Sequence, residues 1–290
     1  MSSISIGKRP VNGLRNITLQ KSSKLTAAQA GSRHLKPAAA GYRQITPDQY
    51  AGFLKSGFRH TISDTGSGYT ATVPDRACNY LSWSDCCSYA DWAALRPMTE
   101  LEYEKGCRGG EVPVPNEYAW GSTVITQQTG HVGTDGSGTE TASPETANCL
   151  YTKEKNSQPI DGPVRVGVYA TATSGRQRAG AGCYGVMELS GNVWERCVTV
   201  GHAAGLAFRG THGDGVLSAN GHATNSDWPG CTGGEITGAR NGATGAGFRG
   251  GGWDQPSSRM RVSNRSHASA VNEYLNRSST IGGRAARSAP

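Results

Sequence analysis

The sequence predicts an irregular, mixed α+β domain with few helices, short strands and long glycine-rich loops. Glycine supplies 41 of 290 residues, about twice the usual ~7% share, which favours turns over long regular elements. Glycine does not recur at every third position, which excludes collagen. After residue 110 helical periodicity fades, and residues 126–147 and 201–247 are long polar loops of the kind that is usually functional or family-specific. The chain is therefore expected to be globular with little regular structure.

Three early segments carry helical periodicity. The first spans residues 45–57, where a proline stands at the first helical position. The second spans residues 82–95, with Ser84 as its expected cap. The third follows Thr99, whose capping box with Glu102 is a strong start signal, and it ends at the next glycine pair.

The sequence has no apolar run of about 18 residues, so no membrane-spanning helix is expected. The N-terminal stretch MSSISIGKRPVNGLRN also lacks the apolar core of a secretory signal. We therefore expect synthesis in a cytoplasm. Any route to the exterior would be one that does not use a secretory signal.

The eight cysteines lack the paired CxxC spacing of a structural metal site. Reduced thiols packed in the core are the favoured interpretation, and disulfides or a metal site are the alternatives. The cysteines are Cys78, Cys86, Cys87, Cys107, Cys149, Cys183, Cys197 and Cys231.

The net charge of +7 is concentrated near the N-terminus, because residues 1–47 hold eight Lys or Arg and no acid. Residues 1–42 are therefore expected to form a basic arm ahead of a domain over 43–290. Such an arm can bind nucleic acid or an acidic protein surface. Aromatic residues for base stacking are scarce there, so docking to a partner or self-association is favoured over nucleic-acid binding.

Three motifs stand in order along the domain. They are LRPMTELEYE at 95–104, followed by CRG at 107–109 and YAWG at 118–121; GCYGVMELSGNVWE at 182–195; and GFRGGGW at 247–253, followed by Arg261, Arg265 and IGGR at 281–284. In sequence and spacing they resemble the sulfatase-modifying-factor family, that of the formylglycine-generating enzyme. The resemblance implies a C-type-lectin-like fold of that subclass. It also implies that the three arginines, with Arg284 as the last, hold the scaffold through buried hydrogen bonds.

The resemblance does not extend to the family's catalytic cysteines. The enzyme uses a copper-binding cysteine pair just after the third motif, and soft thiolates are what selects copper. Here residues 252–261 read GWDQPSSRMR, and no cysteine follows Cys231. We therefore expect no copper and no oxidase activity, and the sequence supplies no other catalytic residues.

The C-terminal segment 249–287 resembles the variable region of proteins diversified by a diversity-generating retroelement. It is rich in Ser, Arg and Asn and contains no Lys, as expected where adenine-directed mutagenesis acts on Asn codons. Small polar residues with an occasional Tyr are typical of adaptable recognition surfaces. Met260, Val262 and Ile281 are expected to be buried beneath this surface. The expected ligand-contacting residues are Trp253, Asp254, Ser257, Ser258, Ser263, Asn264, Ser266, His267, Ser269, Asn272, Tyr274 and Asn276.

These features predict a non-enzymatic receptor-binding protein, in particular a phage tail protein located in the virion or displayed on a surface. Its expected ligand is a protein or glycan on a host cell, and its basic arm would bind a tail component or another copy. The alternatives are an enzyme of the same fold with other chemistry and a fixed carbohydrate-binding domain.

The resemblance also implies structural calcium, which takes six to eight oxygen ligands. The first candidate site combines the carboxylates of Glu188 and Glu195 with the carbonyls of Gly191 and Val193. The alternative for Glu195 is a buried ion pair with Arg261 or Arg284. A second, weaker site combines Asn148, the Cys149 carbonyl and Asp161.

Overall fold

The computed structural model describes residues 15–18, 62–64, 69–71, 73–154, 157–236, 243–269 and 277–288. The helix expected over residues 45–57 lies outside these ranges. Within them, no helix has the length and apolar character needed to cross a membrane.

Two capped helices precede the loop-rich part of the chain. Helix α2 spans Trp83–Trp92 and helix α3 spans Glu100–Arg108. Thr99 caps α3 through the expected capping box with Glu102, and Gly109 ends it. Two single-turn helices follow, α4 at Ala203–Leu206 and the 3-10 turn η2 at Ser257–Met260.

The expected cap of α2 was wrong by two residues. Ser82, not Ser84, accepts a hydrogen bond from the Asp85 amide, and the Asp85 carboxylate accepts one from the Ser82 amide. Ser84 lies inside the helix and donates to the Ile236 carbonyl oxygen at 2.6 Å. Both serines precede the periodic stretch, and only the reciprocal bond with Asp85 distinguishes them.

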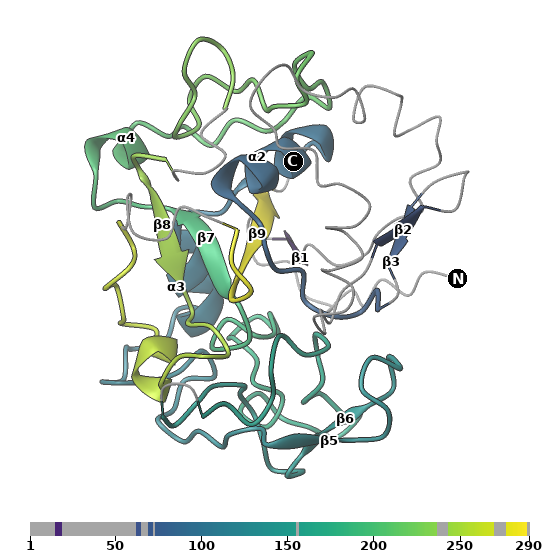
Figure 1. Cartoon of the computed structure of the whole chain (residues 1–290). Helices are drawn as coiled ribbons and strands as arrows, with labels where there is room; N and C mark the ends of the chain where they lie inside the picture. Colours follow the sequence, from purple (N-terminus) through teal and green to yellow (C-terminus); the bar gives the residue numbers. More distant parts are fainter. Residues whose placement is uncertain are drawn as a thin grey trace.

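The central sheet has the strand order β1-β9-β7-β8, with the short β4 also paired to β9. Strands β7 and β9 are parallel, whereas the other pairs are antiparallel. Figure 1 shows β8, β7 and β9 side by side at the centre of the molecule. Helix α3 contacts β7 and β8, and α2 contacts β4 and β9. The strands are β1 Arg15–Thr18, β4 Arg96–Pro97, β7 Trp194–Val198, β8 Ala246–Arg249 and β9 Ile281–Arg287.

Two hairpins complete the strands, β2 Ile62–Asp64 with β3 Tyr69–Ala71, and β5 Gly130–Val132 with β6 Thr141–Ser143. The expectation of a mixed domain with few helices, short strands and long loops is thus confirmed in the described residues. Strand β1 lies within the first 42 residues, so part of the expected basic arm belongs to the edge of the central sheet.

The core lies on both sides of the central sheet. One cluster joins α3 to the third motif through Tyr103, Met260 and Val262, none of which is exposed. Ile281 is 2% exposed and packs with Trp194 and Phe248. The expected burial of Met260, Val262 and Ile281 is therefore confirmed, and these side chains hold the C-terminal segment from below.

Candidate binding surface

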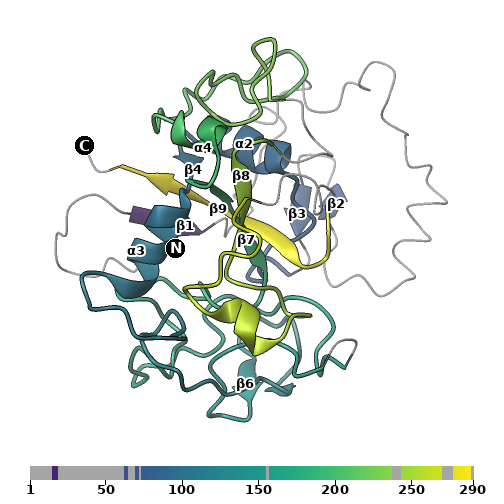
Figure 2. The ribbon, with the colours of Figure 1, turned by 90° about the vertical axis from the view of Figure 1, so that its left-hand side faces the viewer.

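The segment that follows β8 runs along one side of the molecule. Figure 2 shows η2 and its flanking loops on the side that faces the viewer, outside the sheet. Its backbone is fixed from four places: Trp253 N donates to Asn192 O at 2.8 Å, Ser190 Oγ to Met260 O at 2.7 Å, Val262 N to Glu117 O at 2.9 Å, and Phe248 N to His267 O at 2.9 Å. Residues 190–192 belong to the second motif, so this motif directly supports the segment.

Four of the expected contact residues, Ser258, Asn264, Ser266 and His267, form one polar cluster. Ser258, Ser263, Ser266 and Ser269 are exposed, and Asp254, Ser257, Asn264 and His267 are partly exposed. Within the cluster, Ser266 Oγ donates to Asn264 Oδ1 at 2.8 Å and lies 2.9 Å from His267 Nδ1. Asn264 Nδ2 donates to the Ser258 carbonyl oxygen at 3.1 Å. The structure thus brings together residues spread over ten positions.

Trp253 differs from its expected role. It is 7% exposed, and its indole donates to the Ser279 carbonyl oxygen at 3.0 Å. A large ring that packs in the core and ties two parts of the segment together is a scaffold residue. Asn272, Tyr274 and Asn276 lie outside the described residues.

Sequence reasoning missed Arg259. Its guanidinium donates to Ser266 Oγ and lies 3.4 Å from His267 Nδ1, so it stands at the centre of the polar cluster. The signal was present, because Arg259 follows two expected contact residues and arginine is enriched among residues that dominate binding.

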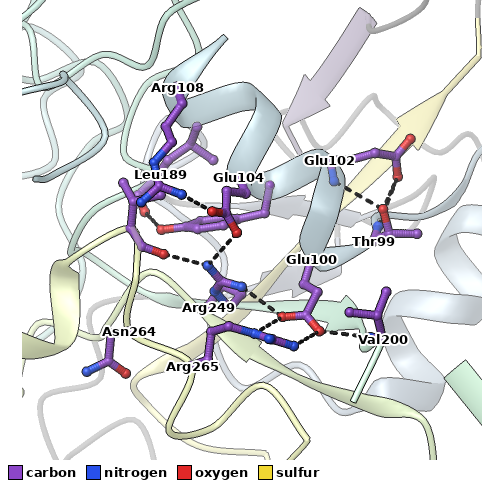
Figure 3. A network of polar contacts seen from close by, with 12 residues as sticks. Thr99, Glu100, Glu102, Glu104, Arg108, Leu189, Val200, Arg249, Asn264 and Arg265 are labelled. Carbon is purple, nitrogen blue, oxygen red and sulfur yellow. Dashed lines mark hydrogen bonds and ion pairs between the residues drawn. The ribbon is translucent and has the colours of Figure 1, made fainter. Parts of the chain in front are cut away.

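A buried ion network lies beneath the cluster. Glu100 at the start of α3 accepts from Arg249 Nη1 at 2.8 Å and from Arg265 Nη2 at 2.7 Å, as Figure 3 shows. Glu100 also accepts from Thr199 Oγ1 and from the Val200 amide. Burial raises the pKa of Glu100, but these hydrogen bonds outweigh burial, so its pKa lies below the usual value. The carboxylate is therefore ionised at neutral pH and holds β8 and the 261–265 loop together.

The three motif arginines have different roles. Arg284 is confirmed as a buried scaffold residue, because it donates to Glu195 and to the Met187 carbonyl oxygen. Arg265 also bonds to a buried partner, Glu100, although about half of its side chain is exposed. Arg261 differs from expectation: its buried Nε atom has no hydrogen-bond partner among the described residues.

The first candidate calcium site does not fit the ion. Glu195 is engaged by Arg284, the alternative partner, whose guanidinium donates to Oε1 and leaves only the buried Oε2 without a partner. Both Glu188 oxygens accept hydrogen bonds, from the Gly167 amide and from Asn192. A guanidinium beside a single free oxygen does not supply the anionic oxygen cage that calcium needs. The groups expected from Glu188, Gly191, Val193 and Glu195 therefore do not fit calcium in this arrangement.

The second candidate calcium site also has its oxygen atoms engaged in hydrogen bonds. Asn148 Oδ1 accepts from the Thr126 amide at 2.8 Å, and the Cys149 carbonyl oxygen accepts from the Gln128 amide at 2.9 Å. Asp161 Oδ1 accepts from Gln158 at 3.0 Å. Among the described residues, no group of three His, Cys, Asp or Glu side chains could hold a metal ion. We derive no role for calcium in either place.

Glu188 makes stability depend on pH. Burial raises its pKa to about 7, against hydrogen bonds from Asn192 and Gly167. The folded chain holds this proton more tightly than the unfolded chain, whose Glu has a pKa near 4.5. Ionisation therefore costs stability as pH rises from about 4.5 to about 7, by at most about 1.4 kcal/mol per pH unit. Urea unfolding across this range is expected to show that decline.

Two variants separate Glu188 from other titrating groups. Glu188→Gln stays neutral, so its stability should decline less steeply over the same range, although it lowers stability overall by placing an amide donor against an N–H. The exposed Glu154 gives the control, and Glu154→Gln should keep the wild-type slope. Equal slopes in all three proteins would contradict this assignment.

The cysteines in the described residues are free thiols. Burial raises the pKa of Cys86 to about 12 and raises that of Cys87, Cys107, Cys149 and Cys197 as well. These thiols therefore stay protonated at neutral pH, and a protonated thiol is neither a nucleophile nor a good metal ligand.

The fold and motifs agree with a comparison of the chain with known families. The profile of the sulfatase-modifying factor enzyme 1-like domain matches residues 22–289. The chain therefore belongs to the family of the formylglycine-generating enzyme and sulfatase-modifying factors. The match begins within the expected arm of residues 1–42. No curated protein matched the sequence.

Proposed function

We propose that this chain is a non-enzymatic receptor-binding member of its family, with a C-type-lectin-like fold and a binding surface on its C-terminal segment. The observation that carries the proposal is the contrast between backbone and side chains over residues 254–269. The backbone is fixed by buried groups, whereas most of the small polar side chains point to solvent. A surface built in this way accepts many different side chains without loss of the fold.

The lack of catalytic groups supports binding over oxidation. The loop after β8 carries Asp, Ser and Arg where the family's enzyme carries its copper-binding cysteines. The buried thiols elsewhere are protonated at neutral pH, as described above for Cys87 and Cys107. A copper-dependent oxidation of a cysteine substrate needs thiolates at that loop.

Diversification by a retroelement and a place in a phage tail extend the proposal. They are supported by the resemblance of segment 249–287 to such variable regions, by the absence of Lys from it, and by a basic N-terminal region suited to docking. The ligand is then a protein or glycan on a host cell. A reverse transcriptase gene and a near-copy of the gene's 3′ end beside it would support this extension.

Bulky substitution of three exposed serines tests the binding surface. In Ser258→Tyr/Ser263→Tyr/Ser266→Tyr, Tm is expected to stay within a few degrees, because exposed changes usually cost less than ~0.5 kcal/mol each. Binding of the labelled protein to a panel of intact bacterial cells and immobilised glycans should fall at least about tenfold. The matched control is Thr123→Tyr/Thr171→Tyr/Thr173→Tyr, made on exposed residues outside the segment.

Three outcomes would reject the proposal. Equal binding by the triple Ser→Tyr variant and the triple Thr→Tyr control would show that the binding site lies outside this segment. A large fall in Tm in the triple Ser→Tyr variant alone would show that these serines support the fold. Conversion of a sulfatase-type cysteine peptide to formylglycine, detected by mass spectrometry, would restore the enzymatic alternative.

A further inference from the structure

A run of exposed apolar residues follows helix α3. Residues 110–116 are all exposed, and four in a row among them are apolar: Val112, Pro113, Val114 and Pro115. Val112 is 84% exposed, and Val114 is 43% exposed. Exposed apolar residues are usually scattered singly, whereas a longer run favours aggregation unless it has a function. This run, the VPVP loop, is therefore a candidate interaction site.

Both ends of the VPVP loop are anchored. At its start, the Glu111 amide donates to the Arg108 carbonyl oxygen at 3.3 Å, and at its end the Glu117 amide donates to the Val114 carbonyl oxygen at 3.2 Å. The side chain of Glu117 is buried and accepts from the Arg108 guanidinium. Within the loop, the prolines fix φ and the valines have few rotamers. The apolar side chains therefore lose little conformational freedom when they bind a partner.

The VPVP loop lies next to the binding segment. The carbonyl oxygen of Glu117, the residue that ends the loop, accepts from the Val262 amide at 2.9 Å. A chain of ion pairs also joins the two. Arg108 binds both Glu117 and Glu104, and the Glu104 carboxylate lies 3.6 Å from the guanidinium of Arg249 in β8. Figure 3 shows the contacts from Arg108 through Glu104 to Arg249. The apolar loop and the binding segment are therefore neighbours.

The polar cluster contributes a positive charge that has no acidic partner in the described part of the chain. The Arg259 guanidinium donates to Ser266 Oγ and lies 3.4 Å from His267 Nδ1, and neither of these groups is a carboxylate. Arg259 is partly exposed, so it can be reached by a ligand. A carboxylate on the ligand would form charge-assisted hydrogen bonds with the guanidinium.

Apolar contact beside a cation fits a protein better than a glycan. The side chains of valine and proline carry no hydrogen-bonding atoms, so the VPVP loop offers nothing to the hydroxyl groups that cover a glycan. A protein interface, in contrast, typically has an apolar centre and a polar rim, and it is enriched in arginine. The VPVP loop supplies the apolar part of such an interface, and the serine-rich cluster with Arg259 supplies the polar part.

We propose that the ligand of this chain is a protein, and that the VPVP loop binds an apolar patch on it beside a carboxylate that pairs with Arg259. The inference rests on the proposed binding function and names the class of ligand. Because the loop lies outside segment 249–287, its apolar contact stays the same when the side chains of the segment change. The loop then contributes affinity to every variant of the segment, and the segment selects among ligands.

Removal of the apolar side chains tests the loop. In Val112→Ser/Val114→Ser, Tm is expected to stay within a few degrees of the wild type, because both residues are exposed. Binding to intact bacterial cells that the wild type recognises should fall at least about tenfold. The matched control is Val132→Ser/Val216→Ser, because these valines are 62% and 64% exposed outside the loop. The control should bind as the wild type does.

Treatment of the same cells separates the two classes of ligand. Digestion of surface proteins with a protease should abolish binding of the wild type, whereas periodate oxidation of glycans should leave it unchanged. Raising NaCl from about 50 to about 300 mM should weaken binding by the wild type more than binding by Arg259→Gln, because salt screens an ion pair at the rim of an interface.

Two results would overturn this proposal and leave the binding function in place. The first is binding that resists protease and is lost after periodate, which would identify a glycan. The second is full binding by Val112→Ser/Val114→Ser under conditions where the triple Ser→Tyr variant has lost it. Full binding by the triple Ser→Tyr variant would instead reject the proposed function, and this inference with it.

Discussion

Glu100→Gln is expected to lower the free energy of unfolding by about 3–5 kcal/mol, as the breaking of a buried ion pair typically does. Its carboxylate accepts from both Arg249 and Arg265, and Arg249 is 1% exposed. The amide of Gln keeps the shape but turns one acceptor into a donor that faces a guanidinium. Arg249 is then left as a buried charge whose remaining acidic partner is the partly exposed Glu104 carboxylate, 3.6 Å away. Urea unfolding followed by tryptophan fluorescence measures the loss.

Hydrogen exchange gives the local consequence of the same change. Because Arg249 also donates to the Val262 carbonyl oxygen and Arg265 is released from Glu100, exchange should accelerate over residues 261–269. The control is Arg277→Gln, which breaks an ion pair whose arginine side chain is 51% exposed and should cost less than about 1 kcal/mol. Equal losses in the two variants would show that the buried network adds nothing beyond a surface pair.

The double replacement Glu100→Met/Arg249→Met tests the same network by removing both charges. Removing both charges leaves no unpaired ion in the core, so part of the stability lost in Glu100→Gln should return. The loop at residues 261–269 should stay fast in exchange, because Arg265 still lacks its partner. Recovered stability together with fast exchange would show that the network mainly holds the binding surface in place and contributes less to the stability of the core.

The sequence predicted those features that depend on residues close together in the chain. Thr99 and Glu102 form the predicted capping box because the spacing of the two residues is itself the geometry of the motif. The burial of Met260 and Val262 followed from their being the apolar residues in a polar segment. The loop-rich architecture followed from the glycine content and from the lack of helical periodicity after residue 110.

Long-range pairs were beyond such reasoning. Glu100 and Arg265 are separated by 165 positions, and no periodicity links a helix start to a distant loop. The resemblance indicated which arginines belong to the scaffold, but not that Arg261 would differ from the others. For Glu195, calcium and Arg284 were both chemically reasonable partners, and only the parallel register of β7 and β9 favours the arginine.

The sequence also gave no sign that the backbone of β8 lies very close to that of the binding segment. This close approach predicts a large loss of stability when Gly247 in β8 is replaced. Gly247 lies opposite Cys197 in the β7–β8 ladder. A Cβ atom at Gly247 would lie 1.9 Å from the Ala268 carbonyl oxygen and 2.2 Å from its carbon. Both atoms are backbone, so no side-chain rotation relieves the contact, and the chain at Ala268 must move. Gly247→Ala is therefore expected to cost about 3 kcal/mol or more, at the upper end for overpacking.

The displacement from Gly247→Ala reaches the binding surface as well as the core. The hydrogen bond from Phe248 N to His267 O holds the cluster residue His267 directly to β8, and this bond must lengthen when Ala268 moves. Binding should therefore fall even at temperatures where the variant is folded. Gly110→Ala is the matched control, because a Cβ there meets nothing within 4 Å, and both its Tm and its binding should match the wild type. If Gly247→Ala also matched the wild type in both, β8 would not position the segment, and the fixed backbone on which the proposed binding surface depends would need another origin.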